Sequence, residues 1–123
     1  MIYKFTIPGK LPSLNEYTGV NRKNRYAGAK LKAELMEFIA FHARAQLGGV
    51  EITRPVRMYY KFVEENKRRD WDNVVSVAVK VIQDTLVSCG VLRGDGQKWV
   101  TGFYPVYGVD KNCPRIEVVI EEV

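Results

Sequence analysis

The segment over 73–89 constrains the fold more than any other, because it is long, apolar on most sides and free of turn residues. Its many valines favour a strand by propensity, but about sixteen residues without a turn exceed the length of an ordinary strand. Asp72 or Asn73 can cap its start, and Gly90 can end it. We therefore predict a helix over 73–89, buried within the fold or partly against a second subunit.

The rest of the chain predicts one further helix and four strands. Over 29–47 the apolar residues recur with helical spacing, and Gly48-Gly49 ends that helix. Residues 9–28 carry turn residues and a basic cluster, and we expect a long loop there. A length of 123 residues fits one domain, 1–123, with an α+β fold in which two helices pack on a mixed sheet in the order β-α-β-α-β-β. Alternating apolar residues predict strands at 2–7, 55–63, 98–109 and 115–123.

Histidine and cysteine are too scarce for a zinc site or a disulfide framework. His42 is the only histidine, and Cys89 and Cys113 have no paired spacing, so we expect two free thiols in a reducing cytoplasm. No apolar run approaches the roughly 20 residues needed to span a bilayer, and the first residues do not resemble a secretion signal. The composition therefore predicts a cytoplasmic protein without a membrane segment.

Positive charge is concentrated in the first part of the chain. Residues 1–69 hold 14 Lys and Arg against 6 Asp and Glu, whereas residues 70–123 hold 5 against 8. Such a cationic surface is expected of a protein that binds nucleic acid, because lysine and arginine side chains neutralise phosphates. A solvated basic surface without a partner is the alternative explanation of the same charge.

Asp70 and Asp72 interrupt this positive charge in the stretch KRRDWDN, residues 67–73. In extended backbone, residues two apart point the same way, so both carboxylates would face one spot. A third acid, Asp95, lies between two glycines in a later loop. Oxygen ligands of this kind suit Mg²⁺, and a cation-rich groove leading to them suits hydrolysis of a phosphodiester. The alternative is that these aspartates only cap a helix and form ion pairs.

Lys80 lies on the predicted helix over 73–89, on the face that also carries Asp84 and the start of the helix. Its ammonium group can reach back toward a phosphate that is held near Asp70 and Asp72. The alternative is an ordinary ion pair with Asp84, four residues further along the helix. Spacing alone does not decide between these two roles.

The combination of RRDWDN, a lysine on the following helix, DTL and GVLRGDGQKW resembles the RusA family of Holliday-junction resolvases of bacteria and their phages. The likeness extends to LPSLNEY and NRYAGAK near the start and to VDKNCPRIEVVIEE at the end. Compact members of the family carry the lysine where this chain has Ser76, and a smaller residue where it has Trp71. Trp71 is expected to be a buried anchor, with stacking on a base as the alternative.

The resemblance implies a homodimer that uses Mg²⁺, or Mn²⁺, to cut four-way DNA junctions by paired symmetrical nicks in recombination and repair. It implies that Asp70, Asp72 and Asp95 bind the metal, while Lys80 stabilises charge at the scissile phosphate. Two rival functions stay open: a DNA-binding protein without catalysis, and a metal nuclease for flaps or other branched DNA. The cations expected to contact phosphates are Lys67, Arg68, Arg69, Arg22, Lys23 and Arg25, and the acids expected as spare ligands or solvated strand-end charges are Glu64 and Glu65.

Overall fold

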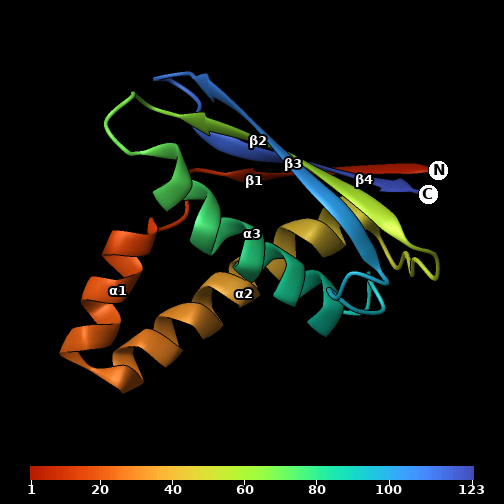
Figure 1. Ribbon diagram of the computed structural model, residues 1–123, viewed down its shortest axis with the longest axis horizontal. Helices are drawn as coiled ribbons and strands as arrows, with labels where there is room; N and C mark the ends of the chain where they lie inside the picture. Colours follow the sequence, from red (N-terminus) through yellow and green to blue (C-terminus); the bar gives the residue numbers. More distant parts are fainter.

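Four strands form a single mixed sheet, and three helices lie against one of its faces (Figure 1). The computed structural model describes all of residues 1–123. The strand order is β1-β4-β2-β3, with β2 parallel to β3 and the other neighbours antiparallel. None of the helices is long and apolar enough to cross a membrane. In chain order the elements are β1 (Ile2–Pro8), α1 (Leu14–Lys23), α2 (Arg25–Leu47), β2 (Val56–Glu64), α3 (Trp71–Ser88), β3 (Val100–Val109) and β4 (Arg115–Glu122).

The predicted α+β class, mixed sheet and four strands are confirmed, but the chain contains one helix more than predicted. The expected loop over 9–28 is wrong, because α1 occupies much of it. Ser13 caps α1 by accepting a hydrogen bond from the Glu16 backbone nitrogen, and its hydroxyl donates to the Glu16 carboxylate. S-x-x-E is the sequence of a capping box. α1 has no fully buried residue, and only the short series Leu14, Tyr17 and Val20 marks an apolar face, with Tyr17 packed against the core.

The core lies between the sheet and α3. The inward residues of β2 alternate along the strand, and they meet the apolar residues of α3 in one buried cluster. Each large side chain buried in this way contributes about 1.5–3 kcal/mol. The predicted burial of the helix over 73–89 is therefore confirmed within a single chain. This packing also holds the start of α3 beside the end of β2.

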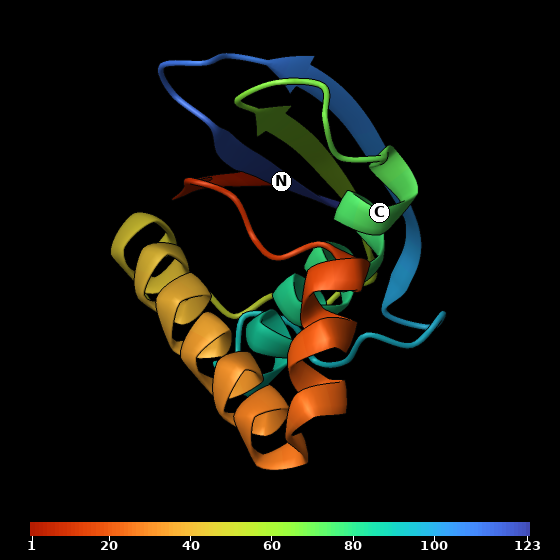
Figure 2. The same ribbon diagram turned by 90° about the vertical axis from the view of Figure 1, so that its left-hand side faces the viewer.

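The two edges of the sheet differ. At the outer edge of β1, the Gln46 side chain accepts a hydrogen bond from the Thr6 backbone nitrogen at 2.7 Å and donates to the Thr6 carbonyl oxygen at 2.8 Å. Its amide group thus makes the two hydrogen bonds that a neighbouring strand would make to Thr6, and it prevents another strand from pairing there. The opposite edge is β3, which contains Pro105 and runs beside α3 (Figure 1). Figure 2 shows α1 and α2 side by side, extending away from the sheet as a helical hairpin.

Candidate functional site

Asp70 and Asp72 lie at the start of α3, where the chain has turned back from the end of β2 (Figure 1). Both residues are exposed. Asp70 stands at the N-cap position, yet its side chain makes no capping hydrogen bond. Neither carboxylate takes part in an ion pair. Side-chain capping and ion pairing therefore do not explain these residues, and the structural role of Asp72 reduces to its negative charge at the positive end of the helix dipole.

Trp71 anchors the backbone between the two aspartates. Its ring stacks on Tyr107 of β3, with centroids 4.2 Å apart and 19° between the planes, and it packs against the core. Tyr107 in turn stacks on Phe62 of β2. Trp71 thus packs as an anchor, but it is half-buried and not buried as predicted. The anchor fixes the backbone from which the two flanking carboxylates project into solvent.

The expected convergence of three carboxylates is not present. Asp95 lies in the loop after α3, and its Oδ2 accepts a hydrogen bond from Lys80 Nζ at 3.2 Å. Lys80 stands about two turns beyond Asp72, which is about 12 Å along the helix axis. No three His, Cys, Asp or Glu side chains gather where they could hold a metal ion. Asp95 is thus a partner of Lys80 and not of the other two aspartates, because its loop meets α3 two turns beyond the helix start.

Lys80 links Asp95 to a second acid, Asp84. Lys80 Nζ lies 3.0 Å from Asp84 Oδ1, and Lys32 of α2 approaches Asp84 Oδ2 at 3.1 Å. Hydrogen bonds to Asp84 and Asp95 raise the pKa of Lys80, so the ammonium group stays protonated at neutral pH. The ion pair with Asp84, which was the alternative explanation of Lys80, is therefore present. The side chain reaches toward Asp95 and not back toward the start of α3.

Asp84→Asn is expected to destabilise the protein at neutral pH. Burial alone would raise the pKa of Asp84, but hydrogen bonds from Lys80 and Lys32 outweigh burial and lower it. A lowered pKa means that the carboxylate stabilises the fold above its unfolded pKa of about 3.9, and that this stabilisation is lost as pH falls through the folded value. Urea unfolding should show a loss of about 1–2 kcal/mol at pH 7. The loss should shrink as the pH falls below the unfolded pKa of about 3.9, and an equal loss at every pH would contradict the assignment.

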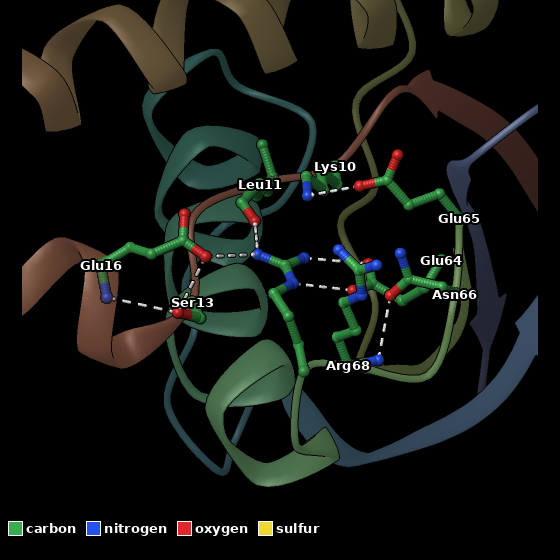
Figure 3. A network of polar contacts seen from close by, with 9 residues as sticks. Lys10, Leu11, Ser13, Glu16, Glu64, Glu65, Asn66 and Arg68 are labelled. Carbon is green, nitrogen blue, oxygen red and sulfur yellow. Dashed lines mark hydrogen bonds and ion pairs between the residues drawn. The ribbon is translucent and has the colours of Figure 1, made fainter. Parts of the chain in front are cut away.

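Arg69 occupies the centre of a polar network next to the two aspartates. Its guanidinium donates to both carboxylate oxygens of Glu64, at 2.7 and 2.9 Å. It also donates to the Leu11 carbonyl oxygen at 2.8 Å and to Glu16 at 3.2 Å (Figure 3). Only 14% of the Arg69 side chain and 7% of the Glu64 side chain are exposed. Arg69 therefore ties the end of β2 to the segment before α1, and it does not present a free guanidinium to a phosphate.

The two glutamates at the end of β2 have different environments. Glu64 is buried against Arg69, so it is neither a spare ligand nor a solvated charge in this structure. Glu65 is exposed and pairs with Lys10 at 2.8 Å (Figure 3). The hydrogen bond from Lys10 lowers the pKa of Glu65. Glu65 thus matches the expected solvated charge, whereas Glu64 is part of the interior.

The remaining cations predicted to bind phosphate form two groups, neither of which makes an ion pair. Lys67 and Arg68 are exposed in the turn that leads into α3. Arg22, Lys23 and Arg25 are exposed at the corner between α1 and α2, about 15 Å along α1 from its start. Figure 1 places the turn and the corner on its left-hand side, above and below α1. These two groups are therefore separate on the surface and do not form one cluster.

Two polar residues near the site, Glu16 and Gln83, have no role in the predictions from sequence. The S-x-x-E pattern marks Glu16 as a capping residue, but its contact with Arg69 depends on the tertiary fold. Gln83 lies in the polar triplet Gln83-Asp84-Thr85 of α3, so its neighbours in sequence do not single it out. Gln83 is buried and accepts a hydrogen bond from the Tyr60 hydroxyl at 3.0 Å. Both residues are placed by contacts between elements distant in sequence.

Comparison with known proteins assigns no family to this chain. No protein-family model matches it. No curated protein matches it in sequence. The resemblance to the RusA resolvases rests on the residue patterns described above, and the functions that it implies are proposals.

Proposed function

We propose that the protein is a divalent-cation-dependent endodeoxyribonuclease of the RusA type, which resolves four-way DNA junctions by paired nicks. The observation that carries this proposal is the pair of exposed carboxylates of Asp70 and Asp72, which have no partner in the chain. They stand beside the unpaired cations Lys67 and Arg68. Two neighbouring anions repel each other, and a bound cation would relieve that repulsion.

The donor set fits Mg²⁺ or Mn²⁺ bound through two protein ligands. Mg²⁺ is usually held by one or two carboxylates together with substrate phosphate and water, and Asp70 and Asp72 offer such hard, accessible oxygens. A bound ion would activate a water and neutralise charge on the scissile phosphate. Asp95 does not belong to this set while Lys80 holds its carboxylate. The proposal therefore assigns metal binding to Asp70 and Asp72, and Asp95 would join them only after leaving Lys80.

The cations give the proposal its DNA-binding surface. Lys67 and Arg68 would hold the phosphates next to the acids, while the corner between α1 and α2 would contact a second stretch of backbone. Phosphate contacts of this kind position DNA without reading its sequence, and they make affinity fall steeply with salt. A homodimer would present two copies of the site to the two related strands of a four-way junction. Neutral Asn variants of the acids should therefore leave this electrostatic binding in place.

A DNA-binding protein without catalysis is the second candidate. The separation of Asp95 from Asp70 and Asp72 favours it, since no group of three acidic side chains assembles in the structure. In that case the cations would bind DNA, and the two exposed aspartates would have no metal to hold. A metal nuclease for flaps or other branched DNA uses the same residues as a resolvase, and only the choice of substrate separates the two.

Incubation with a synthetic mobile four-way junction tests these candidates. We expect Mg²⁺ or Mn²⁺ to support two symmetrical nicks across the junction, and we expect none in EDTA. Three-way, flap and linear duplex substrates of matched sequence serve as controls. Equal cutting of linear duplex would contradict junction resolution, and preferential cutting of flaps would support the flap nuclease. A junction that is bound but never cut with either metal would support the second candidate.

A further inference from the structure

A hollow of about 450 Å³ opens between α3 and the edge strand β3, and it begins about one helical turn beyond the exposed Asp72. Ser76 lies in its wall, and the Ser76 hydroxyl donates to the Asp72 backbone carbonyl one turn earlier in α3. Gln83, at the far end of the hollow, stands about 16 Å beyond Asp72 along the helix axis.

The apolar part of the hollow is a half-exposed aromatic ring facing valine side chains. Phe103 is 49% exposed, although it lies on the side of β3 that faces the helices with its partner Met58. Val75 and Val79 of α3 form the facing wall. A half-exposed phenylalanine ring in a hollow offers a flat surface on which a ligand can stack. Such stacking does not require a charged ligand.

The polar part contains a hydrogen-bond donor at Gln83, whose residue is 9% exposed. The Tyr60 hydroxyl donates to Gln83 Oε1 at 3.0 Å, which leaves the amide nitrogen without a partner in the protein. No fully buried side-chain nitrogen or oxygen lacks a hydrogen bond, so the Gln83 nitrogen keeps some exposure to solvent, and Gln83 is among the residues that line the hollow. Burial raises the pKa of Tyr60, so the hydroxyl keeps its proton and can donate it to Gln83 Oε1.

A hydrogen-bond acceptor stands at the margin of the same hollow. The Asp95 carboxylate lines it, and Lys80 holds that carboxylate in place through an ion pair of 3.2 Å. The second oxygen of Asp95 makes no hydrogen bond to the protein. The hollow thus combines one donor, one acceptor and a flat aromatic surface.

We propose that this hollow binds one unstacked nucleobase of the DNA substrate. A nucleobase has two flat faces for Phe103 and an edge that carries both acceptors and donors, which Gln83 and Asp95 complement. The volume lies within the usual range of small-ligand sites, about 300–1,000 Å³. The proposal rests on the DNA-binding part of the proposed function and is independent of metal binding.

The test compares two single strands of about twelve units in EDTA, one of thymidylate and one of abasic units with the same phosphates. Fluorescence anisotropy should show that the wild-type protein binds the thymidylate strand about tenfold more tightly. Phe103→Leu should remove most of this preference without changing affinity for the abasic strand. Tyr104→Leu is the matched control, since Tyr104 is the next residue, 48% exposed, and stacks on Tyr59 on the other face of the sheet.

Gln83→Glu provides a second variant that keeps an acceptor for the Tyr60 hydroxyl but replaces the donor by an oxygen. The added negative charge should weaken binding of both strands slightly, and loss of the donor should weaken the thymidylate strand several-fold more than the abasic strand. Thermal unfolding of each variant checks that the fold persists. Equal base preference in Phe103→Leu and wild type would overturn the proposal, and so would a wild type that binds both strands equally. Loss of Mg²⁺-dependent cleavage with the base preference intact would overturn the nuclease and leave the nucleobase site standing.

Discussion

Replacing Asp72 with Asn is expected to reduce Mg²⁺-dependent cleavage of a four-way junction by about a thousandfold. The substitution keeps the size of the side chain and removes the anionic oxygen that would hold the cation. Losing metal stabilisation of a transition state costs several kcal/mol, and each 1.4 kcal/mol is a factor of about ten in rate. Asp70→Asn should have an effect of similar size, because both carboxylates are exposed at the same helix start. Single-turnover cleavage at saturating enzyme measures the effect directly.

The same variants must still bind the junction, which separates lost chemistry from lost binding. Affinity in EDTA should be unchanged or slightly higher, since each substitution removes one negative charge near the bound phosphates. Glu34→Gln is the matched control, because Glu34 is an exposed acid on α2 with only a long ion pair to Lys30. It should cleave like wild type. Unchanged cleavage in both aspartate variants would contradict their assignment as metal ligands.

Replacing Arg69 with Met is expected to lower the free energy of unfolding by about 3–5 kcal/mol. The buried Glu64 carboxylate would lose both of its hydrogen bonds from the guanidinium, and removing one member of a buried ion pair leaves an uncompensated charge. Leu11 and Glu16 would also lose a donor, which releases the segment before α1. Urea unfolding followed by circular dichroism measures the change. A phosphate-binding arginine on the surface would show almost none.

A double-mutant cycle identifies the cause of that loss. Glu64→Gln combined with Arg69→Met removes both charges, so the double variant should be more stable than Arg69→Met alone. Lys10→Ala is the control, because the Lys10 pair with Glu65 is exposed and should contribute no more than about 1 kcal/mol. An Arg69→Met protein as stable as the Lys10→Ala protein would show that the network is not structural.

The elements predicted correctly are those with a pattern that is local in sequence. The helix over 73–89 follows from its length and continuous apolar character, and the strands follow from alternation, since one face of each meets the core. α1 was not predicted, because its apolar series is short and contains no fully buried residue, although Tyr17 packs against the core. Ser13 and Glu16 mark its start, and a capping pattern in a polar stretch is a weaker signal than periodicity.

The candidate site was predictable only in part. The backbone over 70–72 is not extended as expected, because α3 begins at Trp71, so the predicted common direction of the Asp70 and Asp72 carboxylates no longer follows. The exposure of both acids beside the stacked Trp71 agrees with expectation. Asp95 does not, because its position depends on where the loop after α3 meets the helix. That meeting point lies at Lys80, and the ion pair formed there separates Asp95 from the acid pair.

The sequence by itself determined the class of fold, the buried central helix, the paired aspartates and the uneven distribution of charge. Only the tertiary structure decided which charges are free to meet a ligand. Arg69 and Lys67 carry the same charge and lie two residues apart. Arg69 is enclosed by Glu64 and Glu16, whereas Lys67 faces solvent. The physical reason is that a long charged side chain takes the nearest favourable partner in space, and folding brings that partner from a distant part of the chain.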